Sequence, residues 1–133
     1  MGHGKRKTPE ATLQCNMVQY LKLVLPMGSI VHHSPNEGKH KPWYRSHQIK
    51  MGMQPGFPDL QIIVIPNFWK DATKWSPIFV EVKAPHGRLS SKQKKVLEDL
   101  HVAGCYTFTC RSIEDLKRCL TPLVSLKDVN THR

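Results

Sequence analysis

Residues 54–64, QPGFPDLQIIV, place an acid, Asp59, directly after a proline turn and directly before an almost purely apolar run. A strand that is apolar on both faces is typical of the centre of a sheet covered by helices. Pro58 is compatible with this strand because proline is tolerated at a strand's first position. Residues 77–85, PIFVEVKAP, have the same character. The two stretches therefore predict the neighbouring strands of a long hairpin.

Three charged side chains are expected to meet at one end of this hairpin. Alternate residues of a strand share a face, so Glu81 and Lys83 point the same way, and pairing of the strands brings Asp59 beside them. An E-x-K pair alone usually marks a solvated face, but the flanking valines, Val80 and Val82, favour a covered strand. Two carboxylates held together there raise each other's pKa values, and a divalent cation removes this conflict.

Asp59 and Glu81 are therefore predicted to bind Mg²⁺, which prefers carboxylate oxygens, water and phosphate oxygens. Such an ion polarises a phosphodiester and lowers the pKa of water. Lys83 could orient that water or stabilise the charge that develops at the phosphorus. Glu10, at the head of the inward stripe of the first helix, could complete the metal shell or act through a water. A simpler explanation of Glu10 is that the helix dipole favours an acid in the first turn.

The whole chain predicts an α/β domain with a mixed central sheet flanked by helices. Its expected order is α, β, β, β, α, β, α. The first helix is expected to stop at Pro26 and Gly28, and the helix over residues 91–103 to stop at Gly104. The residues that signal helix starts are Thr8 with Pro9 after it, the pair Ser90 and Gln93 at capping-box spacing, and Ser112.

Length and composition limit the class of protein. A chain of 133 residues is the size of one domain, and we expect a basic N-terminal segment (1–8) and a single domain (9–133). The net charge of +10 favours a polyanion such as nucleic acid; a merely basic soluble protein is the alternative. The four cysteines lack zinc-site spacing and are interpreted as reduced, mostly buried hydrophobes. Without a bilayer-length apolar run or a secretion signal, an intracellular protein with no membrane partner is expected.

Basic residues gather in two places that could contact nucleic acid. Residues 35–56 form a long basic connection containing two aromatic residues, interpreted as a loop that clamps phosphates and stacks on bases. The alternative is that the aromatic residues plug the core. The second group, made of Arg88, Lys92, Lys94 and Lys95, follows the strand that carries Glu81 and Lys83. The candidate DNA contacts are Lys39, Lys41, Trp43, Tyr44, Arg45, His47, Lys50, Arg88, Lys92, Lys94 and Lys95.

The stretches PGFPDL (55–60) and VEVKAPHGRLSSKQ (80–93) together resemble the PD-(D/E)xK nuclease superfamily, and specifically its VRR-NUC branch. The resemblance covers most of the chain. It implies a restriction endonuclease-like core and cleavage of DNA that depends on Mg²⁺ or Mn²⁺. The roles that it implies are metal ligation by Asp59 and Glu81 with the Val82 carbonyl, a catalytic lysine at Lys83, a helix acid at Glu10 and a supporting polar residue at Gln93.

Free-standing members of this branch look like homodimers that act on branched DNA such as four-way (Holliday) junctions. A phage-type member is expected in the cytoplasm of a bacterial host. Cutting two symmetry-related strands together needs a twofold dimer. The expected interface is the exposed surface of the long hairpin, which carries Trp69 and Trp75 on its connection. The chain departs from the expected pattern at Glu37, which is interpreted as a loop acid rather than a further site carboxylate. Two other functions stay open: a basic DNA-binding module that cuts nothing, and a monomeric nickase or flap endonuclease.

Overall fold

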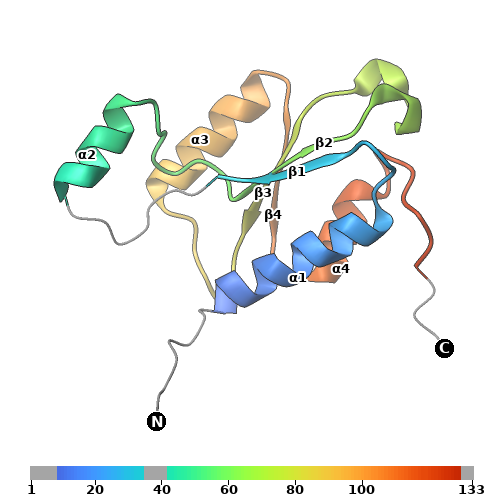
Figure 1. Cartoon of the computed structure of the whole chain (residues 1–133), viewed down its shortest axis with the longest axis horizontal. Helices are drawn as coiled ribbons and strands as arrows, with labels where there is room; N and C mark the ends of the chain where they lie inside the picture. Colours follow the sequence, from blue (N-terminus) through green and yellow to red (C-terminus); the bar gives the residue numbers. More distant parts are fainter. Residues whose placement is uncertain (1–8, 35–41, 130–133) are drawn as a thin grey trace, which may run out of the picture.

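The computed structural model describes residues 9–34 and 42–129 (Figure 1). The predictions for Thr8, Glu37, Lys39 and Lys41 lie outside these ranges. Within them the helices and strands are α1 (Pro9–Val24), β1 (Ile30–His33), α2 (Pro42–Lys50), β2 (Leu60–Ile63), β3 (Ile78–Val82), α3 (Ser91–Val102), β4 (Tyr106–Cys110) and α4 (Ile113–Leu120). Two 3-10 turns, η1 (Pro66–Phe68) and η2 (Ala72–Lys74), lie between β2 and β3. None of the helices in these ranges is long and apolar enough to cross a membrane.

The four strands form one mixed sheet in the order β1-β2-β3-β4. Strand β2 pairs antiparallel with both β1 and β3, so the predicted hairpin of the two central strands is confirmed. Strand β4 pairs parallel with β3, with Val82 opposite Cys110. The crossover between these parallel strands is α3, as parallel neighbours require. The predicted α/β class with a mixed sheet between helices is confirmed.

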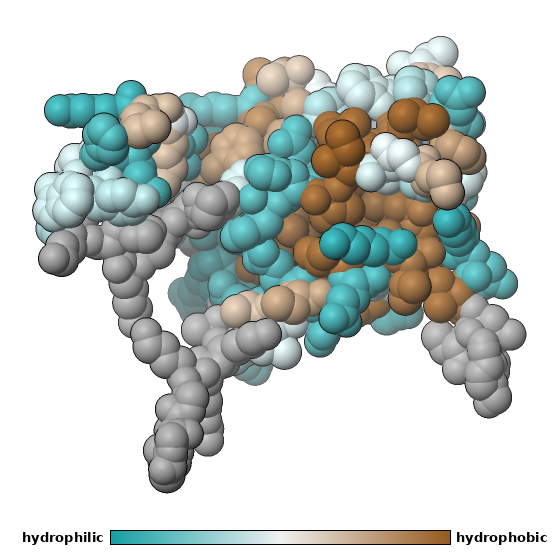
Figure 2. All heavy atoms as spheres, viewed as in Figure 1, coloured by the Kyte–Doolittle hydropathy of each residue, from teal (hydrophilic) through white to brown (hydrophobic). Residues whose placement is uncertain are grey.

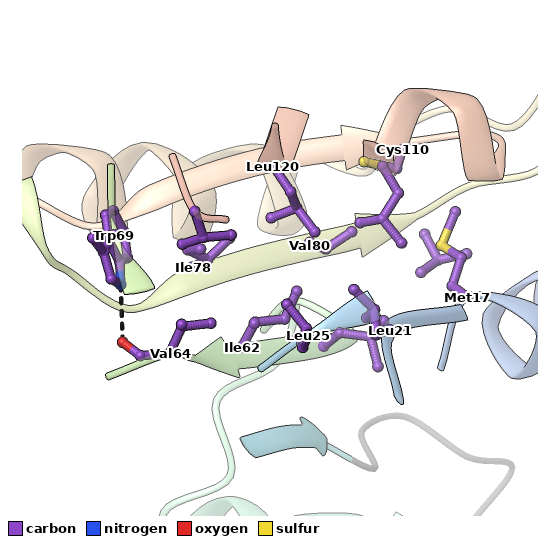
Figure 3. Packing of buried hydrophobic residues seen from close by; sticks show 14 residues of the cluster. Met17, Leu21, Leu25, Ile62, Val64, Trp69, Ile78, Val80, Cys110 and Leu120 are labelled. Atoms are coloured by element: carbon purple, nitrogen blue, oxygen red, sulfur yellow. Dashed lines mark hydrogen bonds between the residues drawn. The ribbon is translucent and has the colours of Figure 1, made fainter. Parts of the chain in front are cut away.

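One face of the sheet carries the hydrophobic core. Helices α1 and α4 pack together on this face, and α3 packs on the other side against β4 (Figure 1). Because side chains alternate along a strand, Ile78, Val80 and Val82 enter the core while Phe79 and Glu81 face the other way. From α1, Met17 and Leu21 are fully buried in the same cluster, as the predicted inward stripe requires. Figure 3 shows the side chains of both layers meeting between the helices and the sheet.

Trp69 belongs to this core and not to an exposed interface, which corrects one prediction. Its side chain is 6% exposed, and its indole Nε1 donates a hydrogen bond to the Val64 carbonyl over 2.9 Å (Figure 3). The indole Nε1 of Trp75 donates to the same carbonyl over 2.6 Å, so the connection is folded back onto the end of β2. The sequence alone could not show which of the two tryptophans is buried. In the fold only Trp69 lies in the hydrophobic core, and Trp75 stays partly exposed.

Helix α2 is the main departure from the predicted order. Residues 35–56 were expected to form a loop, but Pro42–Lys50 are helical, with proline at the first position. The alternative in which Trp43 and Tyr44 plug the core is wrong, because α2 has no buried residue and Trp43 is 68% exposed. The helix was missed because PWYRSHQIK has no apolar stripe of helical period.

The other helix signals are confirmed where they are described. Ser90 and Gln93 form a reciprocal capping box at the start of α3, and the Ser112 side chain caps α4. The expectation for the cysteines is wrong in part. All four are free, but of these only Cys110 is buried, and Cys15 is exposed.

Candidate active site

Asp59 and Glu81 lie side by side where β2 begins and β3 ends. In the antiparallel β2–β3 pair, Leu60 lies opposite Val80. Asp59, which precedes Leu60, is therefore level with Glu81, which follows Val80. The Asp59 Oδ2 atom accepts a hydrogen bond from the Val82 backbone N–H over 2.8 Å. The two carboxyl groups are close enough for each to shift the pKa of the other. The structure therefore brings together the two acids that the sequence singled out.

Burial makes this pair of acids electrostatically costly. Glu81 is only 2% exposed, and burial, followed by repulsion from Asp59, raises the pKa of Glu81 to about 9. Burial also raises the pKa of Asp59, although hydrogen bonds from the Val82 N–H and with Glu81 oppose the rise. Near neutral pH the metal-free pair therefore holds a proton that two exposed carboxyl groups would have lost.

One oxygen of Glu81 is anchored and the other is not. Gln93, which caps α3, donates from Nε2 to Glu81 Oε2 over 3.0 Å, and its Oε1 accepts from the Ser90 N–H over 2.8 Å. Glu81 Oε1 is buried, and among the described residues it has no hydrogen-bond donor. A buried carboxylate oxygen that lacks a donor has an incomplete environment, which a cation would complete.

Lys83 and Glu10 lie near this pair, and both have atoms beside Gly87. Lys83 is 8% exposed and follows β3 directly. Glu10, in the first turn of α1, is half-buried, and its Oε2 accepts a hydrogen bond from the Ala84 N–H over 3.4 Å. A Cβ added at Gly87 would lie 3.0 Å from Glu10 Oε2 and 3.4 Å from Lys83 Cδ. The small residue thus leaves room for the Glu10 carboxylate and the aliphatic chain of Lys83 beside it.

The donor set suits a hard cation. Within residues 9–34 and 42–129, no three side chains of the His, Cys, Asp and Glu types form a ready-made metal cage. Asp59 and Glu81 instead offer carboxylate oxygens, and Glu10 adds negative charge nearby. Mg²⁺ is commonly held by one or two carboxylates, with water and substrate phosphate filling the other positions. The residues present therefore fit Mg²⁺ or Mn²⁺, and the unpaired Glu81 Oε1 is the atom that argues for it.

Two features of the site were not predicted from the sequence. Arg111, directly after β4, donates from Nη1 to the carbonyls of Ala84 and Gly87 over 2.8 and 2.7 Å. It thereby fixes the turn that follows Lys83. The parallel register of β3 and β4 would have predicted this role. Val82 lies opposite Cys110, so Arg111 must lie beside the residues that follow Val82.

The second unpredicted feature is the packing at Gly56. This residue has a φ of +81°, and a Cβ added there would lie 2.8 Å from the Lys92 carbonyl carbon. The loop before Asp59 therefore rests directly on the backbone of the first turn of α3, next to Gln93. Glycine is required here both for the backbone conformation and for this close approach.

The basic residues predicted to contact DNA divide between α2 and the start of α3. Arg88 precedes α3, Lys92 and Lys94 lie in its first turn, and all three are exposed; Lys95 forms a 2.7 Å ion pair with Asp99. On α2 the predicted contacts are Trp43, Tyr44, Arg45, His47 and Lys50. Of the latter, Arg45 is half-buried and the others are exposed.

One hollow in the described part of the chain lies away from the carboxylate pair. A hollow of about 830 Å³ occurs on the α1 and α4 side of the sheet, bounded by Tyr20, Ile113 and Leu126 among others. None of the predicted catalytic residues lines it. The exposed basic side chains around the start of α3 suit a polyanionic substrate.

The chain is similar to known proteins in sequence and in fold. The family model described as VRR-NUC domain matches residues 3–114, which confirms the resemblance drawn from the sequence. A solved structure titled VRR_NUC domain protein superimposes with a TM-score of 0.66, covering 88% of this chain and 88% of that chain, at 19% identity. At this identity the likeness shows the fold. No curated protein matches this chain.

Proposed function

Because the chain belongs to the VRR-NUC family of nuclease domains, we propose that it is a divalent-metal-dependent endonuclease for branched DNA. The observation that supports this best is the buried pair of Asp59 and Glu81, held together although burial and repulsion raise the pKa of Glu81 to about 9. A fold that keeps two acids in this position loses stability, and a bound cation offsets the loss.

The proposed ligands of Mg²⁺ or Mn²⁺ are the carboxylates of Asp59 and Glu81 with the backbone carbonyl of Val82, and Glu10 completes the shell or acts through a water. When bound, such an ion polarises a phosphodiester and lowers the pKa of a water molecule. Gln93 keeps the Glu81 carboxylate in place through its 3.0 Å hydrogen bond, a positioning role of the kind that tunes metal sites.

Lys83 is the proposed catalytic lysine. Its side chain lies on the Glu81 face of β3 and is almost wholly withdrawn from water. A positive charge in such a place stabilises negative charge that develops on a phosphate far better than an exposed one does. Arg88, Lys92, Lys94 and Lys95 are the proposed contacts to flanking phosphates, which position DNA without reading its sequence.

We further propose that two copies act together as a Holliday junction resolvase. A four-way junction has two symmetry-related strands to cut, and one domain with one site cannot cut both in concert. The described residues support the one site in each chain; the pairing of chains rests on this requirement of the substrate.

The first test is a panel of labelled DNAs, namely duplex, flap, single-stranded and four-way junction, incubated with Mg²⁺, with Mn²⁺ or with EDTA. The wild-type protein is expected to cut the junction at paired symmetric positions with either metal and to cut nothing in EDTA. Asp59→Asn and Lys83→Met are expected to bind the junction with nearly unchanged affinity and to cut it at least ~100-fold more slowly. Glu98→Gln, a change of an exposed acid on α3, is the control that should cut normally.

The result also separates the other functions. Binding without any cleavage by the wild-type protein supports the basic DNA-binding module. Single unpaired nicks, or a preference for the flap, support the monomeric nickase or flap endonuclease. Metal-dependent cleavage by Asp59→Asn at the wild-type rate contradicts the assignment of the site.

A further inference from the structure

Helix α2 stands apart from the rest of the fold. No other described helix or strand packs against it, and none of its residues is buried. Figure 1 shows it beyond the N-terminal end of α3, away from the sheet. Trp43 is 68% exposed and meets the Tyr44 ring edge to face, at 5.8 Å between ring centroids. A large aromatic face is thus presented outward on a helix that supports no core.

The composition of α2 indicates what could cover it. Its sequence, PWYRSHQIK, contains Arg45, His47 and Lys50 and no acid. In Figure 2 the α2 end of the molecule is mostly teal to pale with some tan, and the brown apolar surface of this face gathers away from it. A helix of this length is marginal without tertiary support. Cationic groups interleaved with aromatic rings suit a polyanion that has exposed planar groups, which is a nucleic acid with unpaired bases.

Unpaired bases, and not paired ones, are the match for Trp43. In a duplex both faces of each base are covered by its neighbours, so only the phosphates and groove edges are accessible. Where strands branch or separate, base faces become available for stacking on an aromatic ring, and such stacking is tolerant of sequence.

The position of α2 ties it to the active site. The chain runs from Lys50 through residues 51–58 to Asp59, a span of at most about 30 Å. Along the way Gly56 rests on the first turn of α3. A hollow of about 360 Å³ there is lined by Gln54, Pro55, Ser91, Lys92, Lys95 and Val96. This path joins the cations of α2 to the lysines of α3, and its length corresponds to about nine nucleotides of duplex.

From these observations, and resting on the proposed nuclease function, we propose that α2 is a base-stacking arm that selects DNA with unpaired nucleotides near the bond to be cut. Trp43 stacks on an unpaired base. Arg45 and Lys50 contact the phosphates that flank it. The substrate class is thereby narrowed to branched DNA with unstacked or single-stranded nucleotides within about one helical turn of the scissile phosphate.

The test measures binding in EDTA, where no cleavage occurs. Fluorescence anisotropy is recorded with a forked DNA, a fully paired duplex of the same length and a short oligo(dT). Trp43→Ala is expected to weaken binding to the fork and to oligo(dT) by about 5- to 100-fold, and to the duplex by less than about twofold. Trp43→Phe, which keeps an aromatic face, should recover most of the loss. Val102→Ala, on a residue that is 75% exposed at the far end of α3, is the matched control and should bind all three DNAs normally.

A second variant separates stacking from charge. Arg45→Gln should weaken binding to all three DNAs and lower the slope of log affinity against log salt by about one, because one phosphate contact is lost. Trp43→Ala should leave that slope unchanged.

Each contrary outcome points to a different error. An equal loss on fork and duplex with Trp43→Ala, or no loss on either, overturns the stacking arm while the nuclease assignment stands. A change in sedimentation coefficient with unchanged DNA binding shows that α2 docks on a second copy of the chain and overturns the proposal. Failure of the wild-type protein to bind any of the DNAs contradicts the proposed function itself.

Discussion

At the scale of single residues, Glu81 is almost inaccessible to water and has Asp59 as its acidic neighbour. Strand alternation was enough to predict that Asp59, Glu81 and Lys83 converge, because the period of two and the pairing of neighbouring strands are local rules. Arg111 was not predictable in this way. Its role depends on which strand lies parallel to β3, a contact between residues far apart in the chain.

The raised pKa of Glu81 predicts how the stability of the metal-free protein depends on pH. The folded-state pKa is about 9, against an ordinary value of 4.5, so the folded state keeps a proton that the unfolded chain releases. Below about pH 4.5 Glu81 is protonated in both the folded and the unfolded chain, so the metal-free protein has its full stability. As the pH rises from 4.5 toward 9, the unfolded chain loses this proton more readily than the folded one, and the stability of the folded state falls progressively.

Glu81→Gln removes this penalty. It should stabilise the metal-free protein by about 0.5–2 kcal/mol at pH 8, with little difference near pH 4, and it should abolish cleavage. Urea unfolding in EDTA at the two pH values measures this, with Glu98→Gln as the control. If the Glu81→Gln variant is instead less stable than wild type at pH 8, the two acids are not in electrostatic conflict.

Arg111→Ala should lower the cleavage rate more than the affinity for DNA. The guanidinium holds the carbonyls of Ala84 and Gly87, and the loss of these bonds frees the turn beside Lys83 and Glu10. We expect a fall in kcat of about tenfold or more, a change in DNA Kd within about twofold, and a loss of about 1–3 kcal/mol in stability.

Arg111→Lys should restore little, because an ammonium group cannot reproduce the planar fork of donors. The control is Arg118→Ala, which removes an exposed arginine that pairs with Asp115 on the surface and should leave kcat unchanged. Single-turnover cleavage and anisotropy separate the two quantities. Equal losses in kcat and in affinity would assign Arg111 to the DNA surface instead of to the turn.

At the scale of elements, the parts that position the site were predicted where their signals are local. The Ser90–Gln93 capping box indicates the start of α3, and the Ser112 cap indicates the start of α4. Apolar runs indicate β2 and β3. Helix α2 was missed because a helix that buries nothing leaves no periodic apolar stripe. The contact between the Gly56 loop and α3 was also invisible, because it joins two elements through backbone atoms that carry no sequence signal.

Gly56→Ala tests this contact. Gly56 and Gly104 both have positive φ, +81° and +99°, but a Cβ at Gly104 would meet nothing within 4 Å, whereas one at Gly56 would lie 2.8 Å from the Lys92 backbone. Gly104→Ala should therefore cost about 1 kcal/mol for its backbone conformation alone, and Gly56→Ala about 1–3 kcal/mol more.

Because the Gly56 loop leads into Asp59, Gly56→Ala should also slow metal-dependent cleavage by about tenfold or more, while Gly104→Ala cleaves at the wild-type rate. Thermal unfolding and cleavage assays on the two variants check both expectations. Similar stability losses in the two variants would mean that the loop moves off α3 without cost.

At the scale of the whole molecule, the net charge of +10 favours a polyanionic partner for the VRR-NUC domain. The fold class was predictable because its order of elements follows from local patterns. The number of chains that act together was not predictable from the sequence. The expected interface included Trp69, whose side chain is instead buried in the hydrophobic core.

A supercoiled plasmid that extrudes a cruciform tests whether two active sites act together. If a dimer makes both cuts while it stays bound, the wild-type protein with Mg²⁺ should convert the plasmid directly to the linear form. Preincubation with Asp59→Asn chains in roughly tenfold excess places most active chains in mixed dimers, which have one working site. Such dimers should give nicked circles.

Gel electrophoresis against time distinguishes the linear from the nicked product, and an excess of Glu98→Gln chains, which keep a working site, should still give linear plasmid. If the wild-type protein yields only nicked circles at every concentration, each chain cuts on its own, and the monomeric nickase becomes the correct description of an otherwise unchanged active site.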